Sequence, residues 1–366
     1  MNSIIGIKIV QLISSQGRSF LFKTTNHRNR NEAKSTYTKM LILPTTPMDW
    51  KKLLPVAGII ILVYILWRFD IGKILAVFSS IDPLYVALCF LSIPFWLLVL
   101  NIEWQLILKQ QNIHVSFAYS LKNYFIGYFY GFITPGGIGN YLRALYLRQE
   151  SNVPLPKCIS NIITFNTIDL ITLFILSSIG GLVLLGQYPY LFILSLLFLF
   201  SVTAVFVFFL RQKKSKQLFE KLIKTQIFQT IQGYMDDPIE TFYEDLPSFK
   251  SLRLPFLISF VGWLVFFSEL YLIAQLFDIH VPFFTLFFIL AIAATIASIP
   301  ISIYGLGTRD AALIALLSLY GVSPENCISF TLFWFTVFWV TPSIIGAFIT
   351  LFEYKKLPSK PKFASS

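Results

Sequence analysis

The chain has 366 residues, of which 56% are hydrophobic and only 13% are charged, and its formal net charge is +11. A soluble domain of this length carries about 25% charged residues on its surface, so the composition excludes an ordinary soluble enzyme. The positive charge fits the Lys and Arg of cytoplasmic loops in membrane proteins, and we expect no nucleic-acid partner. The chain is therefore expected to lie in a membrane along most of its length.

Residues 1–47 differ from the rest because they are polar and basic and hold a single acid, Glu32. Such a segment is typical of a transit peptide or of a cytoplasmic tail. Alternatively, the start codon has been placed too early, because Met48 is a second plausible start. The transmembrane domain is therefore predicted to cover residues 48–353. Residues 354–366 are predicted to form a cytoplasmic tail.

A series of apolar stretches follows Met48, each near or above the ~17–25 residues that a tilted helix needs to cross a bilayer. These stretches are Leu53–Phe69, Leu84–Leu100, Phe117–Ile133, Ile159–Leu185, Tyr190–Leu210, Leu254–Phe277, Phe283–Ile303 and Ile328–Phe352. The sizeable polar insertion among them is the loop 211–253, which is basic in its first half and acidic later.

The distribution of Lys and Arg predicts which loops face the cytoplasm. Basic residues gather before Leu53, around Lys109 and Lys122, in Arg143–Lys157, in Arg211–Lys224 and in the tail, so both termini are expected to be cytoplasmic. The turns near Asp70–Asp82, Gln187–Pro189 and Asp278–His280 are poor in Lys and Arg and are expected to be external. Both flanks of 117–148 are then cytoplasmic and both flanks of 283–322 are external. The predicted fold is an all-α, polytopic membrane helix bundle with six full spans and two re-entrant helical hairpins. A simple bundle of eight spans is the alternative.

The two predicted hairpins resemble each other. Glu103 and Glu269 are 166 positions apart, and the same offset aligns Asn112–Phe117 with Asp278–Phe283. Further matches in the same order are Pro135 with Pro300, Gly137 with Gly305, Gly139 with Gly307, Arg143 with Arg309, and Cys158 with Cys327. These matches predict a repeat with halves at 84–185 and 254–352, placed in opposite orientation as in many transporters.

In inverted-repeat transporters the substrate binds between the repeats, where helices are interrupted. The Pro- and Gly-rich breaks that contain Gly137, Gly139, Gly305 and Gly307 are such interruptions. Each break precedes a short segment whose first backbone amides are free, which favours an anion such as a lipid phosphate. The four glycines are therefore candidate substrate-binding positions.

Charged residues near the breaks and inside the spans extend this candidate site. Arg143 and Arg309 follow the two breaks; an Arg there binds phosphate bidentately, reaches the headgroups, or pairs with an acid. Asp310 is expected to pair with Arg309 or to contact a cationic headgroup. Asp169 and Glu269 lie inside apolar spans, where a carboxylate costs about 2.5–3.5 kcal/mol at the bilayer centre, so they are candidates for proton coupling or for pairing with the Arg residues.

Other features are interpreted more simply. Glu103 is expected at the membrane interface, and the aromatic stretch Phe330–Trp339 is expected to face lipid or the interface. The sequence contains no nucleotide-binding loop in a strand–helix context, no GxSxG motif and no zinc-ligand spacing. We therefore predict no enzymatic activity, no cofactor and no metal.

Three segments resemble a known family, the transmembrane flippase-like region of lysylphosphatidylglycerol synthases. Glu103–Leu108 is similar to the family's Arg-Trp-x-x-Leu-Leu segment, with Glu in place of Arg. Thr134–Ala144 is similar to its Pro-Gly-x-x-Gly-Glu-x-x-Arg-Ala segment, with Asn140 in place of the acid. Pro300–Ala312 is similar to its Pro-x-Ser-x-x-Gly-x-Gly-x-Arg-Glu-Ala-Ala segment, with Asp for Glu. The chain also departs from the family at Asn166, where Arg is frequent.

The resemblance covers Leu53 to Phe352 and implies a stand-alone member, without the soluble aminoacyl-transferase domain, that moves a polar-headed lipid between the leaflets of the cytoplasmic membrane. The lipid would be an anionic or aminoacylated phospholipid or a polyprenyl-linked sugar, with its headgroup near Arg143, Arg309 and Asp310. A subunit of a lipid-modifying glycosyl- or aminoacyl-transferase, with Asp169 as base, is the alternative. A scaffold that recruits a separate synthase or glycosyltransferase through the loop 211–253 is a third possibility.

Overall fold

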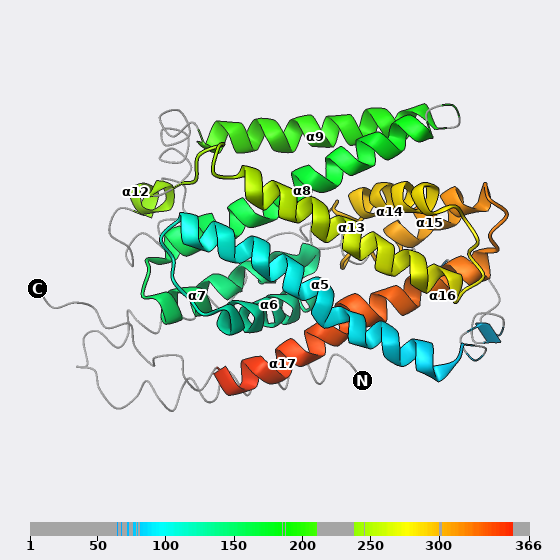
Figure 1. Cartoon of the computed structure of the whole chain (residues 1–366), viewed down its shortest axis with the longest axis horizontal. Helices are drawn as coiled ribbons and strands as arrows, with labels where there is room; N and C mark the ends of the chain where they lie inside the picture. Colours follow the sequence, from blue (N-terminus) through cyan, green and yellow to red (C-terminus); the bar gives the residue numbers. More distant parts are fainter. Residues whose placement is uncertain are drawn as a thin grey trace, which may run out of the picture. The chain divides into compact units, whose positions relative to one another are not determined.

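The structure is a computed structural model that describes residues 81–353 except 185, 187, 211–237, 245 and 300–301, together with a few positions between 64 and 79. The predicted leader, the predicted tail, nearly all of the first span and most of the loop 211–253 lie outside the described residues. The described part of the chain forms helices joined by turns (Figure 1).

In chain order the helices are α5 (Pro83–Gln110), α6 (Phe117–Phe132), η2 (Pro135–Leu142), α7 (Arg143–Ser151), α8 (Leu155–Val183), α9 (Pro189–Leu210), α12 (Pro238–Tyr243), α13 (Arg253–Gln275), α14 (Phe283–Ala297), α15 (Thr308–Ser318), α16 (Pro324–Phe335), η3 (Thr336–Val340) and α17 (Thr341–Glu353). Within the described residues, five helical segments are long and apolar enough to cross a membrane: α5, α8, α9, α13 and the continuous run from α16 to α17. The prediction of an all-helical membrane bundle is confirmed.

Local sequence signals explain where the helices begin and end. The Asp82 carboxylate accepts a hydrogen bond of 2.8 Å from the Leu84 amide at the start of α5. α14 ends at Ala297, short of the predicted Ile303. Pro300 follows the C-cap residue Ser298 by two residues, where proline commonly stops a helix. The chain then turns at Gly305, which has a φ of +78°. A β-carbon at Gly305 would also collide with Ala297, so this break depends on glycine.

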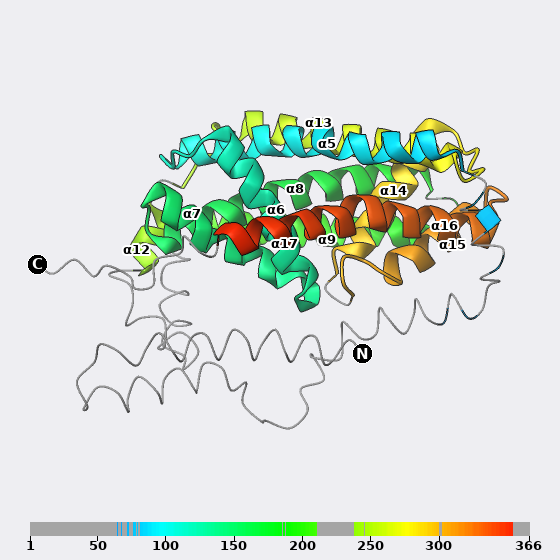
Figure 2. The same cartoon turned by 90° about the horizontal axis from the view of Figure 1, so that it is seen from below.

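The backbone repeats between the two halves. α5, α6, α7 and α8 in the first half have the same order and relative lengths as α13, α14, α15 and the run α16–α17 in the second. Left-handed residues fall at matched places: Asn112 and Asp278, Gly137 and Gly305, and Asn152 and Gly321. α5 and α13 pack side by side and run in opposite directions (Figures 1 and 2). These features favour the predicted repeat. Opposite membrane orientation of the halves and the re-entrant hairpins stay predictions.

The aromatic stretch Phe330–Trp339 packs inside the bundle, so its interpretation as a lipid-facing surface is wrong for its main members. Phe330 and Phe338 are fully buried, and Trp334 is 2% exposed. Trp96 of α5 lies with its ring centroid 5.6 Å from that of Phe338, edge to face. Phe and Trp are common both on lipid-facing surfaces and in the interior of a helix bundle. The composition of the stretch therefore could not distinguish the bundle interior from the lipid.

α6 and α17 approach each other closely at a glycine. A β-carbon on Gly346 would collide with the backbone oxygen of Phe125 in α6. Small residues at such crossings let two membrane helices pack backbone to backbone. This contact fixes α17 against the helix that precedes the first break.

Replacing Gly346 by Ala is expected to destabilise the protein by about 1–3 kcal/mol, because the added methyl group must push α17 away from α6. The matched control is Gly262→Ala, where the nearest atoms would lie 3.7 Å from the new carbon. The measurement is the melting temperature of each variant in detergent. Equal melting temperatures for Gly346→Ala and wild type would show that the α6–α17 contact is not tight.

The predicted inversion is tested by single cysteines at the two breaks. Ile138 in η2 is 69% exposed and Ser298 at the end of α14 is exposed. In a background lacking the three buried native cysteines, we expect a charged thiol reagent to label Ile138→Cys from the cytoplasmic side and Ser298→Cys from the opposite side. Labels are compared in right-side-out and inside-out vesicles. Labelling of both from one side would contradict the inverted arrangement.

Candidate functional site

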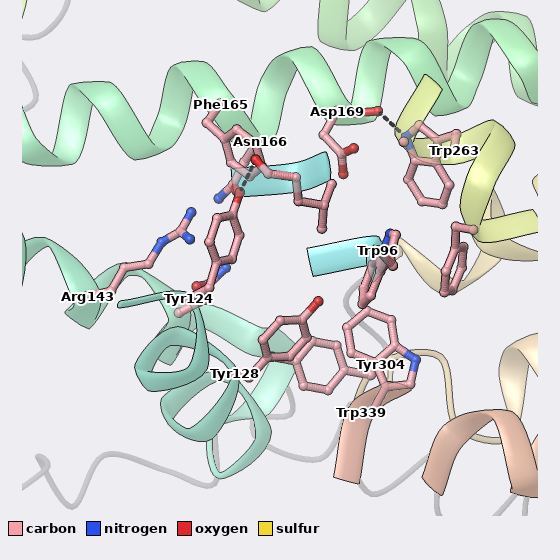
Figure 3. Close-up of a pocket in the computed structure, with 14 residues that line it drawn as sticks. Trp96, Tyr124, Tyr128, Arg143, Phe165, Asn166, Asp169, Trp263, Tyr304 and Trp339 are labelled. Carbon is pink, nitrogen blue, oxygen red and sulfur yellow. Dashed lines mark hydrogen bonds between the residues drawn. The ribbon is translucent and has the colours of Figure 1, made fainter. Parts of the chain in front are cut away.

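A cavity of about 190 Å³ lies within the bundle (Figure 3). It is lined by Trp96, Leu100, Tyr124, Tyr128, Asn140, Arg143, Phe165, Asn166, Asp169, Gly262, Trp263, Phe266, Tyr304 and Trp339. The lining includes residues from both predicted breaks, since Asn140 belongs to η2 and Tyr304 to the connection between α14 and α15. Only Arg143 and Asp169 carry a formal charge among these 14 residues.

Arg143 begins α7 directly after the first break, and its side chain is only 1% exposed. Its guanidinium carbon lies 4.6 Å from the ring centroid of Trp104, 4.9 Å from that of Tyr124 and 5.6 Å from that of Phe165. The three rings stabilise the cation through their π faces. Nε and Nη2 have no hydrogen-bond partner among the described residues. The guanidinium is thus fixed in position but keeps N–H groups available for an anion.

Asp169 lies on α8 at the other side of the lining, beyond Asn166 (Figure 3). Its carboxylate accepts a long hydrogen bond of 3.5 Å from Ser259, while Trp263 donates to its backbone oxygen at 3.2 Å. Both partners belong to α13, so Asp169 joins α8 to the second half of the chain. A carboxylate with one weak hydrogen bond retains most of its capacity to accept a proton or a donor group.

Asn140 and Asn166 replace charged residues of the family pattern, and both side chains line the cavity. Amides donate and accept hydrogen bonds without a net charge. Asn166 stands where the resembling family frequently has Arg, so Arg143 is the one cation among the lining residues.

The second predicted arginine has a different environment. Arg309 donates to Asp310 Oδ1 from Nη2 at 2.8 Å and from Nε at 3.0 Å, and its guanidinium carbon lies 4.3 Å from the Trp334 ring centroid. Asp310 Oδ2 accepts from the Gly307 amide at 2.8 Å. Both charged side chains are buried and neither lines the cavity. The pair neutralises Arg309 and holds the turn into α15.

The remaining predicted positions lie around the cavity rather than in its lining. Gly139 donates to Thr134 Oγ1 at 2.7 Å, and Gly137 has a φ of +70°, so both shape the first break as Gly305 and Gly307 shape the second. Glu269 is half-buried on α13, outside the lining, and its Oε2 has no partner among the described residues. The structure thus brings together Arg143 and Asp169 and separates from them Arg309, Asp310 and Glu269.

Two residues that the sequence did not single out close the cavity. Tyr304 has a φ of +49°, unusual for an aromatic residue, and its ring stacks on Trp339 with a centroid distance of 4.4 Å. A β-carbon on Gly131 would collide with the Tyr304 hydroxyl, so the tyrosine reaches into α6 of the first half. The glycines near Tyr304 predicted an interruption of the helix at this point. They did not indicate that the Tyr304 side chain would reach the cavity.

Glu103, which was expected at the membrane interface, is fully buried on α5. Neither carboxylate oxygen has a hydrogen-bond partner among the described residues. Glu103 follows the lining residue Leu100 by one helical turn, on the same face of α5. Glu103 lies three residues beyond the predicted apolar stretch Leu84–Leu100, and the structure continues the helix to Gln110, so the sequence placed the end of this span too early.

Comparison with known proteins gives a family and two relatives. Residues 53–346 match the family described as lysylphosphatidylglycerol synthase TM region. The UPF0104 membrane protein MJ1595 of Methanocaldococcus jannaschii is 24% identical over 339 residues, which cover 84% of this chain and 96% of the relative. The UPF0104 membrane protein PH1989 of Pyrococcus horikoshii is 23% identical over 336 residues, covering 84% of this chain and 99% of the relative.

Asp310→Asn is expected to destabilise the protein by about 3–5 kcal/mol, because it leaves the Arg309 guanidinium buried without a counter-ion. The control is Glu150→Gln, which removes an exposed carboxylate from α7. Melting temperatures in detergent compare the two variants with wild type. Unchanged stability of the Asp310→Asn variant would show that the Arg309–Asp310 pair does not stabilise the fold. The two residues would then again be candidates for binding substrate.

Proposed function

The chain belongs to the lysylphosphatidylglycerol synthase transmembrane region family, and we propose that it translocates a lipid with a phosphate-containing headgroup between the leaflets of the cytoplasmic membrane. The observation that carries this proposal is Arg143, a buried guanidinium that faces a cavity and has free N–H groups among the described residues. Both termini are proposed to be cytoplasmic.

A buried cation without a counter-ion is costly, and an arginine keeps its charge at any physiological pH. Within the described residues Arg143 forms no ion pair, and the aromatic rings around it offset only part of this cost. An anion with several oxygens would satisfy the guanidinium bidentately, and phosphate has this geometry. We therefore assign the headgroup phosphate to Arg143.

The remaining lining suits a polar but uncharged portion of a headgroup. Asn140, Asn166 and the hydroxyl groups of Tyr128 and Tyr304 supply hydrogen-bond donors and acceptors, while tryptophan rings supply flat apolar surfaces. Asp169 lies at the far side from Arg143 and could meet an ammonium group. A cavity of about 190 Å³ holds a headgroup but not acyl chains, which would stay in the lipid.

Anionic phospholipids, aminoacylated phospholipids and polyprenyl-linked sugars all carry the phosphate ester that this assignment requires. Leaflet exchange in proteoliposomes separates them, using a fluorescent phosphatidylglycerol, a fluorescent lysyl-phosphatidylglycerol and a short-chain polyprenyl phosphate monosaccharide as three probes. We expect purified wild-type protein to accelerate exchange of at least one of them. Failure with all three would overturn the proposed function.

Arg143→Gln is expected to slow this exchange at least about tenfold, because a charged hydrogen bond to phosphate contributes about 1.5–3 kcal/mol. Arg148→Gln is the matched control, since Arg148 lies on the same helix with an exposed side chain. Arg143→Lys keeps the charge but loses the planar fork, and should give an intermediate rate. Exchange by Arg143→Gln at the wild-type rate would show that Arg143 does not hold the headgroup.

A further inference from the structure

Asp169 in the lining of the cavity and Glu103 one helical turn beyond the lining residue Leu100 are acids that the proposed function does not use for binding phosphate. Glu103 is fully buried, and both of its carboxylate oxygens lack a hydrogen-bond partner among the described residues. Asp169 lines the cavity and accepts one long hydrogen bond from Ser259. We propose that Glu103 and Asp169 form a proton-binding pair, which takes up one proton when an anionic headgroup binds to Arg143. This inference rests on the proposed function.

The pair and the cation are joined through α5 and α6. Glu103 precedes Trp104, whose ring lies 4.6 Å from the Arg143 guanidinium carbon. Tyr124 contacts the same guanidinium at 4.9 Å and donates its hydroxyl to the Leu100 carbonyl, one turn before Glu103 on α5, at 3.3 Å. The Trp104 ring centroid also lies 6.5 Å from that of Phe165, one turn before Asp169 on α8. The three charged residues therefore lie around one aromatic cluster formed by α5, α6 and α8.

The other groups around the pair are neutral at physiological pH. α6 presents Tyr124 and Tyr128, and the connection between α14 and α15 presents Tyr304. α13 presents Ser259 and Trp263 to Asp169, and η3 presents Trp339 to the cavity. α7 presents Arg143. Among the described residues at this site, the charge balance thus depends on Arg143, Glu103 and Asp169.

Charge balance then sets the number of protons. If both acids were ionised, the site would hold one uncompensated negative charge, which is costly inside an apolar bundle. With one proton shared by the pair, the site holds one negative charge and the positive charge of Arg143, so it is neutral overall although neither acid forms an ion pair with the guanidinium. The titration belongs to the pair rather than to either acid alone, because the two carboxyl groups act on each other.

Binding of a phosphodiester changes this balance. The phosphate becomes the counter-ion of Arg143 and adds a second negative charge to the site, so the remaining carboxylate is left without compensation. Neutralising that carboxylate requires one further proton, which forms an O–H bond on Glu103 or Asp169 and is released when the headgroup leaves. Headgroup translocation would therefore carry one proton with each lipid phosphate and respond to a pH gradient.

The test counts protons during binding to the full-length protein in detergent. Dihexanoyl phosphatidylglycerol is the probe, because its phosphodiester stays a monoanion near neutral pH and cannot itself contribute protons. Titration calorimetry at pH 7 in two buffers of different ionisation enthalpy gives the protons taken up per probe bound. We expect about one proton for wild type and for each of Glu103→Gln and Asp169→Asn, because the remaining acid can take up the compensating proton. The double variant Glu103→Gln/Asp169→Asn has no titrating acid left and is expected to take up none. Glu150→Gln, an exposed acid on α7, should behave as wild type.

The possible outcomes separate this proposal from the proposed function. Probe binding by wild type without proton uptake overturns the proton-binding pair and leaves lipid binding intact. Undiminished uptake by the double variant overturns the assignment of the proton to these two acids. If the double variant does not fold, the pH dependence of uptake decides instead: each single variant is expected to take up its proton over a different pH range from wild type, and identical pH profiles overturn the pair. An absence of binding together with an absence of leaflet exchange for all three lipid probes overturns the proposed function itself.

Discussion

A cation that cannot lose its proton is held at the start of α7, inside an apolar bundle, by the faces of three aromatic rings. Residues of α5, α6 and α8 supply the three rings that surround this group. The glycines of α6 and η2 bring the first break close to the helix before it, which puts Arg143 beneath Trp104 and Tyr124. α8 completes the ring cage with Phe165. The cavity lies against this charge, and no residue in the described part of the chain forms an ion pair with it.

The two halves of the chain each bury an arginine after a break, but the surroundings of the two arginines differ. Arg143 and Arg309 occupy matched positions after the two breaks, yet the residue that follows is Ala144 in one half and Asp310 in the other. Asp310 neutralises its neighbour and also accepts from the Gly307 amide, so the second break is locked by its own ion pair. The first break lacks this internal partner. The difference between Ala144 and Asp310 at equivalent positions thus leaves Arg143 without an adjacent acid, whereas Arg309 has one.

The sequence predicted the framework better than the cavity. Long apolar runs, proline- and glycine-rich breaks and isolated charges each have one dominant physical meaning in a membrane, so the helices and the positions of Arg143 and Asp169 followed from them. Aromatic residues occur in several membrane environments, including the lipid-facing surface, the interface and the interior of the bundle. Trp96, Trp263 and Trp339 lie in apolar runs that would be equally suitable facing lipid, and only the packing of helices distant in sequence turns them inward. The pairing of Arg309 with Asp310 was one of two open alternatives, since adjacent residues on a helix need a particular turn to meet.

The wider turn at η3 has a consequence for how this bundle tolerates change. Trp339 lies within η3, a π-helical turn, and its ring stacks on Tyr304 over the cavity. An α-helix advances by about 100° per residue, so deleting one residue from this turn would rotate all of α17 by that amount. Gly346 would then leave the Phe125 carbonyl while Trp339 swung away from Tyr304. The stacking of Trp339 on Tyr304 and the contact of Gly346 with α6 therefore both depend on the number of residues in η3. Related chains should conserve the length of this turn more strictly than its residue types.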